Sequence, residues 1–102
     1  MRSYLTIGGL VAAGFDASGA YLLKVTHSGC GVYSTHTWER VARDYTIAYP
    51  TAGASVGIGP IAGKTIFVNE IDFQKGIMRL TSRDSRITLN CESSGIEVEV
   101  RQ

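Results

Sequence analysis

The sequence contains little proline and cysteine, no marked excess of charge of either sign and no long apolar run, and these shortages exclude several classes of protein. Ten basic and nine acidic residues leave a net charge of +1, whereas a nucleic-acid-binding protein usually carries a basic excess or a basic stripe. No segment approaches the roughly 20 apolar residues that a membrane-spanning helix needs. We therefore expect neither a nucleic-acid partner nor a membrane partner.

The two cysteines, Cys30 and Cys91, lie far apart and form no CxxC pair. They do not indicate a disulfide-stabilised scaffold. Cys91 follows Ile87 and Leu89 in strict alternation. This pattern predicts that Cys91 lies on the apolar face of a strand as a small buried free thiol.

The sequence does contain short apolar segments separated by turn residues at close intervals. Within 14–44 the turn residues 16–19, 28–29 and 34–37 separate three such segments. Turns this close leave no room for a helix of ordinary length, so the pattern predicts an antiparallel β-meander. The 12 glycines and 2 prolines are typical of a compact fold with many tight turns.

We predict a single all-β domain of about eight short antiparallel strands in two meanders, packed as a small β-sandwich or flattened barrel. In the last strand Ile96, Val98 and Val100 are expected to face inward, while Glu97 and Glu99 face outward and protect a sheet edge. The strands are expected within 4–15 (bent at Gly8-Gly9), 21–25, 32–33, 38–41, 65–71, 77–81, 86–91 and 96–100.

The two halves of the chain are weakly alike. Leu23–Thr26 aligns with Met78–Thr81 at an offset of 55 positions (78 − 23). The alignment fits a duplicated unit covering about 14–44 and 65–100, and it fits equally a chance match between two amphipathic meanders.

The first meander follows a recurring order of turns and strands. Asp16–Gly19 precedes the apolar Tyr21–Val25, Ser28-Gly29 forms the next turn, and Thr37-Trp38 opens a further strand. This order resembles one blade of a WD40-like β-propeller over about 31 of the 102 residues. One chain has room for two blades, whereas a closed propeller takes at least four. The resemblance therefore implies a generic meander, or a carbohydrate-binding propeller assembled from several two-blade chains.

The connection 45–63 is long, apolar and rich in glycine. Its end, Gly63-Lys64-Thr65, imitates a phosphate-binding loop, but the first glycine of that motif would fall on Ile58, and strand-like residues follow. Long connections are often functional or lie at an interface. Ile58 and Ile61 are therefore expected either to fold back over the core or to contact another chain, for example in a homo-oligomer.

Tyr33, Trp38 and Arg40 form the best candidate binding set. On an alternating strand Trp38 and Arg40 share a face, and an arginine beside an exposed aromatic ring is a common recognition pair. The alternative is a core tryptophan with Arg40 at its rim.

His27 and Cys30 flank the Ser28-Gly29 turn, and His27 is a further candidate site residue. His27 with Cys30 or a nearby carboxylate would suit a small hydrolase-like enzyme, provided that a third group orients the base and an oxyanion pocket exists. A metal site would also need His36, which lies six positions beyond Cys30 and roughly 20 Å away along an extended strand. We expect no metal and no cofactor.

The N-terminal residues loosely imitate a signal peptide, but Arg2 is their only basic residue, and Thr6, Gly8 and Gly9 dilute the apolar stretch. We expect a first strand there and a cytoplasmic protein. Since no complete catalytic set is present, the leading hypothesis is a non-enzymatic binding module, acting as a homo-oligomer with a protein or small-molecule partner. The hydrolase-like enzyme and the carbohydrate-binding propeller are the alternatives.

Overall fold

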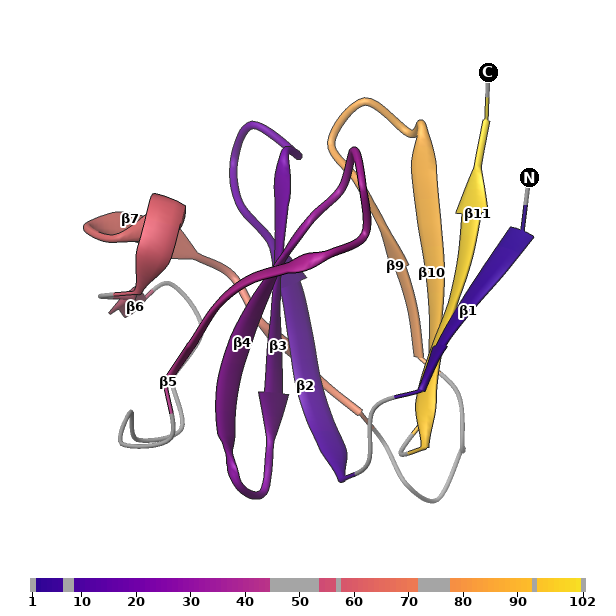
Figure 1. Cartoon of the computed structure of the whole chain (residues 1–102). Helices are drawn as coiled ribbons and strands as arrows, with labels where there is room; N and C mark the ends of the chain where they lie inside the picture. The colour runs from indigo at the N-terminus through magenta and orange to yellow at the C-terminus, as the bar shows by residue number, and fades with distance from the viewer. Residues whose placement is uncertain are drawn as a thin grey trace.

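The computed structural model describes residues 2–6, 9–44, 54–56, 58–71, 78–92 and 94–101. These residues form eleven strands and one short 3-10 helix: β1 (Arg2–Thr6), β2 (Leu10–Phe15), β3 (Tyr21–Thr26), β4 (Gly29–Ser34), β5 (Arg40–Asp44), β6 (Ala54–Val56), η1 (Gly59–Ile61), β7 (Lys64–Ile66), β8 (Asn69–Glu70), β9 (Met78–Thr81), β10 (Ile87–Glu92) and β11 (Gly95–Val100). The strands build three antiparallel sheets, in the orders β1-β11-β10-β9, β5-β4-β3-β2-β8 and β6-β7. The two large sheets stand face to face (Figure 1), so the predicted all-β, sandwich-like domain is confirmed.

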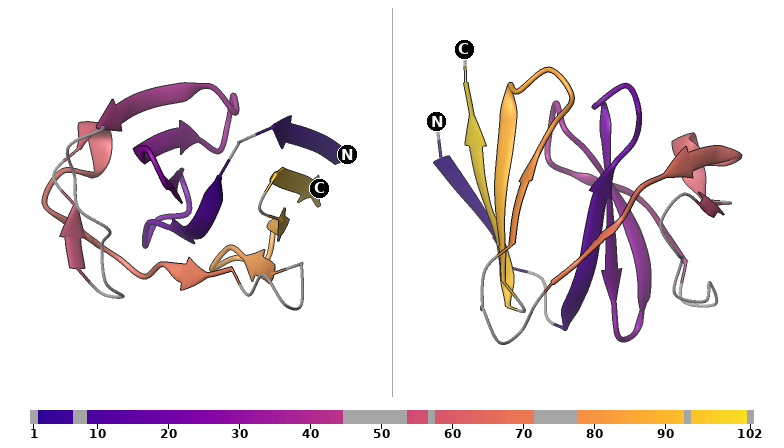
Figure 2. Two further views of the ribbon diagram at one scale, coloured as in Figure 1. Left: turned by 90° about the horizontal axis from the view of Figure 1, so that it is seen from below. Right: turned by 180° about the vertical axis from the view of Figure 1, so that it is seen from behind.

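The five-stranded sheet is the middle of three layers, because both of its faces are buried. Successive side chains of a strand point to opposite faces, so Leu22 and Leu23 of β3 pack in opposite directions, and both are fully buried. Leu22 joins the cluster shared with the four-stranded sheet, and Leu23 joins the cluster shared with η1 and β7. Seen along the strands in Figure 2, β7 and the four-stranded sheet lie on opposite sides of β2, β3 and β4.

The described end of the apolar connection, residues 58–63, folds back over this middle sheet. Ile58 and Ile61 are 4% and 0% exposed, and they pack in one cluster with Val25 and Val32. The first of the two predicted alternatives, packing on the chain's own core, is therefore confirmed. It also corrects the prediction of Ile58 and Ile61 as interface residues, because neither side chain presents a surface to another chain. Positions 45–53 and 57 of the predicted connection lie outside the described residues.

The prediction of one bent strand across 4–15 is wrong, since this segment contributes strands to two different sheets. β1 pairs with β11, whereas β2 pairs with β3 and β8. Gly9 lies between β1 and β2 with a φ of 70°, and its carbonyl accepts a 3.2 Å hydrogen bond from the His27 N–H. The chain crosses between the sheets near the glycines where the sequence predicted a bend, because glycine adopts positive φ without a steric penalty.

The last strand, β11, lies inside its sheet between β1 and β10. The prediction that its charges protect a sheet edge is therefore wrong. The predicted alternation is confirmed, because Ile96 and Val98 are 0% and 1% exposed, while Glu97 receives a hydrogen bond from Asn90 on the opposite face. The edges of the large sheets are β1, β9, β5 and β8.

The predicted burial of Cys91 beside Ile87 and Leu89 is confirmed. Cys91 is 0% exposed, and it is one of two free cysteines. Burial raises the pKa of the Cys91 thiol to about 12. Because the thiolate is the reactive form of cysteine, this thiol acts as a core side chain and not as a nucleophile at neutral pH.

The turn between β2 and β3 is closed by its own side chains. The Asp16 N–H donates to the Tyr21 carbonyl, and the Gly19 N–H donates to the Asp16 carbonyl, both at 3.0 Å. The Asp16 carboxylate accepts from the Tyr21 N–H at 3.0 Å and from the Ser18 hydroxyl at 2.6 Å. Gly19 has a φ of 75°, which a side chain would disfavour.

The turn between β9 and β10 repeats this arrangement. The Ser82 N–H donates to the Ile87 carbonyl at 2.8 Å, and the Ser85 N–H donates to the Ser82 carbonyl at 2.9 Å. Here the Ser82 hydroxyl accepts from the Ile87 N–H at 3.1 Å and donates to Asp84 at 2.8 Å. Ser85 has the positive φ, 62°, that Gly19 has in the first turn.

The repeated turn is followed in each case by a pair of strands of the same length and spacing. β3 and β4 correspond to β10 and β11 at a constant offset of 66 positions (87 − 21), with equal strand lengths. This structural correspondence, with its offset of 66, differs from the sequence alignment, whose offset of 55 pairs β3 with β9. An origin by duplication of 14–44 and 65–100 stays a prediction.

Candidate functional site

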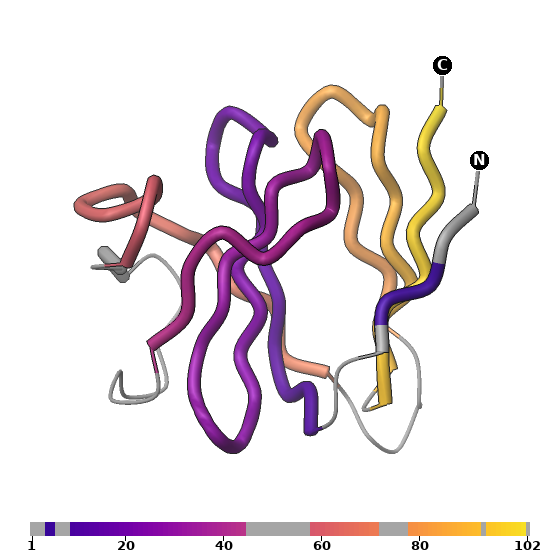
Figure 3. The backbone as a smooth tube through the Cα atoms, in the orientation of Figure 1, coloured from indigo at the N-terminus to yellow at the C-terminus, as the bar shows by residue number. Residues whose placement is uncertain are grey.

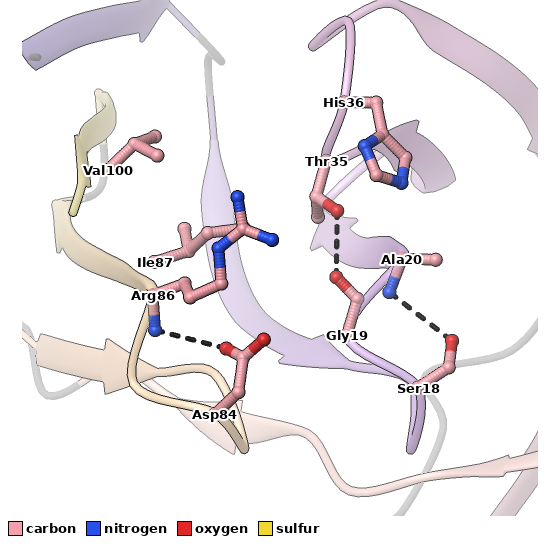
Figure 4. A pocket seen from close by; sticks show the side chains of 9 residues that line it. All are labelled: Ser18, Gly19, Ala20, Thr35, His36, Asp84, Arg86, Ile87 and Val100. Atoms are coloured by element: carbon pink, nitrogen blue, oxygen red, sulfur yellow. Dashed lines mark hydrogen bonds between the residues drawn. The ribbon is translucent and has the colours of Figure 1, made fainter. Parts of the chain in front are cut away.

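Three turns lie together at one end of the sandwich and enclose a small pocket. They are the turns that follow β2, β4 and β9, and all three stand at the upper end of the backbone trace in Figure 3. The pocket has a volume of about 110 Å³, enough for a few water molecules or one small ligand. We call it the turn pocket. It is lined by Ser18, Gly19, Ala20, Thr35, His36, Asp84, Arg86, Ile87 and Val100 (Figure 4).

One wall of the turn pocket is fixed by hydrogen bonds between the first two turns. The Thr35 hydroxyl donates to the Gly19 carbonyl at 2.7 Å, and the Thr35 N–H donates to the Ala20 carbonyl at 2.9 Å. The Ser18 hydroxyl donates to Asp16 and accepts from the Ala20 N–H at 3.3 Å. These bonds hold the wall in one shape, and they use the protons of both hydroxyl groups.

The opposite wall carries one carboxylate and one guanidinium group. Hydrogen bonds from the Arg86 N–H at 3.0 Å and from the Ser82 hydroxyl at 2.8 Å lower the pKa of Asp84 below its ordinary value. Both bonds end on Oδ1, which leaves Oδ2 without a hydrogen bond from the described residues. Figure 4 shows the Arg86 guanidinium reaching between this wall and Thr35, and it forms no hydrogen bond with any described residue.

The turn pocket contains a serine, a histidine and an aspartate, but these do not form a catalytic triad. The Ser18 hydroxyl donates its proton to Asp16, and within the described part of the chain no hydrogen bond joins Ser18 to His36 or His36 to Asp84. Nucleophilic catalysis requires the nucleophile and its base within hydrogen-bonding reach, with a third group orienting the base.

The buried Asp16 side chain holds Ser18 of the first wall in place, because it accepts the hydrogen bond from the Ser18 hydroxyl. The Asp16 side chain is 1% exposed, and the Lys64 ammonium lies 3.8 Å from it. Burial raises the pKa of the Asp16 carboxyl, but hydrogen bonds from the Ser18 hydroxyl and the Tyr21 N–H, together with Lys64, outweigh burial and leave the pKa below its ordinary value of 3.8. Asp16 is therefore ionised at neutral pH.

Acid is expected to weaken the fold partly through Asp16. A carboxyl group with a depressed folded pKa stabilises the protein above its unfolded pKa, and this contribution is lost as the pH falls through the folded value. The urea midpoint of the wild type should therefore fall as the pH is lowered below about 4, and Asp16→Asn should reduce this fall. Glu70→Gln, at an exposed position of β8, is the control. Equal acid sensitivity in Asp16→Asn and the wild type would contradict the expectation.

The structure pairs Tyr33 with Arg40 across β4 and β5, but it does not place Trp38 on the same strand as Arg40. Trp38 lies in the turn before β5 with a φ of 58°, and its N–H donates to the Ser34 carbonyl at 2.8 Å. Because β5 begins at Arg40, the predicted sharing of one strand face by Trp38 and Arg40 is wrong. Tyr33 and Trp38 are partly buried against the cluster between the large sheets, whereas Arg40 is exposed. This arrangement matches the alternative of a core tryptophan.

His27 and Cys30 are not brought together as a catalytic pair. His27 lies in the exposed turn after β3, and its ring lies beside Gly9. Cys30 is buried, and burial followed by the Asp44 carboxylate raises the pKa of its thiol, against an opposing effect of Lys24. A raised thiol pKa disfavours the thiolate that a nucleophile requires.

The described residues show neither a metal cluster nor a membrane-spanning helix. They contain no group of three or more His, Cys, Asp and Glu side chains placed to hold a metal ion. His27 and His36 lie beyond opposite ends of β4. Within the same residues there is no helix long and apolar enough to cross a membrane.

In the part of the chain that the structure describes, neither large sheet has an uncovered apolar outer face on which a neighbouring propeller blade could pack. A blade inside a propeller packs on a neighbour at each face. The outer face of the four-stranded sheet is polar, since Arg79, Asn90 and Glu97 lie side by side across β9, β10 and β11. The outer face of the five-stranded sheet is already covered by η1 and β7.

Sequence reasoning missed most residues of the turn pocket. Ser18, Thr35 and Asp84 were recognised only as turn formers, and Arg86 only as the start of a strand. The signal that would have found them is the similarity of the two turns, Asp-x-Ser-Gly and Ser-x-Asp-Ser. Even so, only the strand topology shows that these turns meet at one end.

No protein-family model, no curated protein and no solved structure matches this chain. The case for a function therefore rests on the geometry of its pockets and surfaces.

Proposed function

We propose that this chain is a non-enzymatic binding module and that the turn pocket is its ligand site. The observation that carries the proposal is the Arg86 guanidinium, which reaches into a partly open pocket, attracts the Asp84 carboxylate and forms no hydrogen bond with the described residues. A fixed cavity with a few convergent polar groups and an apolar floor is typical of a small-molecule site. Ile87 and Val100 supply the apolar part.

The chemistry of the walls favours a small carboxylic acid that carries a hydrogen-bond donor beside its carboxylate. Arginine binds carboxylates through two parallel N–H bonds, and the His36 ring across the pocket offers a further polar contact. The free Oδ2 of Asp84 accepts a donor such as an amino or hydroxyl group. A volume of about 110 Å³ limits the ligand to a short side chain.

The leading hypothesis also includes a cellular location and self-association. We propose a cytoplasmic location, in keeping with two unpaired, buried cysteines. Self-association is also part of the hypothesis, but its original support is lost because Ile58 and Ile61 are buried. Solution mass across a range of concentrations tests it directly.

The ligand proposal is tested by titrating isotopically labelled protein with L-alanine, L-lactate and acetate while recording backbone amide spectra. L-alanine and L-lactate should shift the amides of 18–20, 35–36 and 84–87. Acetate, which lacks the neighbouring donor, should bind about tenfold more weakly. Arg86→Gln should weaken binding of both acids by at least about tenfold.

The matched control is Arg83→Gln, because Arg83 belongs to the same turn but lies outside the turn pocket. It should bind both acids as the wild type does. An unchanged affinity in Arg86→Gln, or shifts that avoid all three turns, would remove the turn pocket as the site of this ligand class.

A further inference from the structure

A second surface, separate from the turn pocket, lies between the open edges of the two large sheets. β9 pairs with β10 on one side, and within the described part of the chain no strand pairs with it on the other. In the rear view of Figure 2 the segment that leads into β8 crosses in front of β2 at an angle and descends toward the lower end of β9. The space between this segment and β9 is a groove of about 310 Å³, which we call the edge groove; it is lined by Phe15, Asp16, Ala17, Phe67, Asn69, Leu80, Thr81 and Arg83.

The edge groove exposes apolar surface that the fold does not use. Phe67 is 68% exposed, although its neighbours Ile66 and Val68 are 1% and 8% exposed. Phe15 and Leu80 are only partly buried and line the same groove. An exposed aromatic ring beside further apolar side chains is typical of a surface that contacts another molecule.

Among the described residues, no strand pairs with the outer edge of β9, so this edge can bind an extended segment. An edge strand directs a row of N–H and C=O groups away from its sheet, and a peptide that adds as a new strand satisfies these groups. β9 contains no proline and is four residues long. β8, across the groove, has only two residues and offers a much shorter edge.

The charges around the edge groove select an acidic partner. Arg83 lines the groove and is exposed, whereas Arg79 lies beside the groove on the outer face of β9 and donates to Asn90 at 3.5 Å. The one carboxylate in the lining, Asp16, is already engaged by Ser18, Tyr21 and Lys64, so the Arg83 guanidinium is the charge in the lining that is left for a partner. A second copy of this chain fits less well, because antiparallel pairing of two β9 strands would bring their arginines close to one another.

We propose that the edge groove and the free edge of β9 receive an extended segment of a partner protein in which apolar and acidic residues alternate. The partner strand would pair with the backbone of Met78–Thr81, place an apolar side chain against Phe67 and Leu80, and place a carboxylate near Arg83. Such pairing uses main-chain hydrogen bonds for affinity and alternate side chains for specificity.

The test uses an acetylated octapeptide of alternating leucine and glutamate, with a leucine–lysine octapeptide as its matched control. The acidic peptide should shift the amides of 78–81 and 67–69 in labelled protein and slow their hydrogen exchange. The basic peptide should bind at least about tenfold more weakly. Arg83→Gln and Phe67→Ala should each reduce the affinity for the acidic peptide by about fivefold or more, while Arg86→Gln should leave it unchanged.

Several results would overturn the proposal. Equal binding of both peptides would show apolar adhesion without charge selection, and shifts confined to other strands would place binding elsewhere. Concentration-dependent shifts at 78–81 without peptide would assign the edge to a second copy of the chain. Both variants alter exposed side chains, and a thermal melt of each verifies folding. Arg83→Gln and Arg86→Gln also separate the two sites, because each should impair one ligand only.

Discussion

Replacing Ile61 by alanine is expected to lower the free energy of unfolding by about 3 kcal/mol. Ile61 is 0% exposed and lies in η1, the short helix that covers the outer face of the five-stranded sheet. Removing three methyl or methylene carbons leaves a cavity against Val25 and Val32, which share its cluster, because strands in a sheet cannot move far to fill it. Urea denaturation followed by tryptophan fluorescence measures the effect, with Trp38 as the only tryptophan.

The control for Ile61→Ala is Phe67→Ala, which removes a larger side chain from an exposed position. Its free energy of unfolding should stay within about 0.5 kcal/mol of the wild type. If Ile61 instead served a contact between chains, Ile61→Ala would change the solution mass and leave the unfolding of the monomer almost unaltered. That result would contradict the three-layer packing.

Gly14→Ala is expected to destabilise the protein by about 2 to 3 kcal/mol. A Cβ atom at this position would overlap the carbonyl oxygen of Phe67 and lie 3.1 Å from the Cα of Val68. That neighbouring backbone is held in place, because the Ile71 N–H donates to Val11 of β2 at 2.9 Å. The added methyl group must therefore push β2 and the segment before β8 apart, and thermal unfolding should report the loss.

Gly31→Ala is the matched control for Gly14→Ala. Both glycines lie in strands, and neither has a positive φ. A Cβ atom at position 31 would lie 2.6 Å from the Lys24 Cε, which is the far end of a flexible side chain and can rotate away. Since alanine suits a strand better than glycine, Gly31→Ala should leave stability unchanged or raise it by about 0.5 kcal/mol. A loss equal to that of Gly14→Ala would show that both effects come from general crowding.

The fold class was predictable because turn residues and alternation are local signals. The alternation of Ile87, Leu89 and Cys91 identified a buried strand face, and the turns at 16–19 and 28–29 marked the first meander. The assignment of strands to sheets could not be predicted in the same way, because it depends on contacts between residues far apart in the sequence. The division of 4–15 between two sheets depends on β11, whose residues lie at the far end of the sequence.

The candidate sites were harder to predict than the fold. Trp38 and Arg40 suggested a binding surface because an extended strand was assumed, and the positive φ of Trp38 breaks that assumption. Arg86 gave no sequence signal, since a single arginine after a turn is common. Arg86 becomes a candidate site residue because it lines the turn pocket together with Thr35, which lies 51 positions earlier (86 − 35). Only the packing of the two large sheets brings these two residues to the same pocket.

The pairing of β1 with β11 has a consequence for synthesis on the ribosome. β1 is translated long before β11, yet Leu5 pairs with Ile96, 91 positions later (96 − 5), and among the described residues β1 pairs with no other strand. The first meander can fold as soon as β5 has emerged, whereas β1 must wait unpaired while most of the chain is translated. Contacts so distant in sequence slow folding, and an unpaired strand is exposed to wrong partners. Closure of the four-stranded sheet is therefore expected as the last folding step, when β11 pairs with β1.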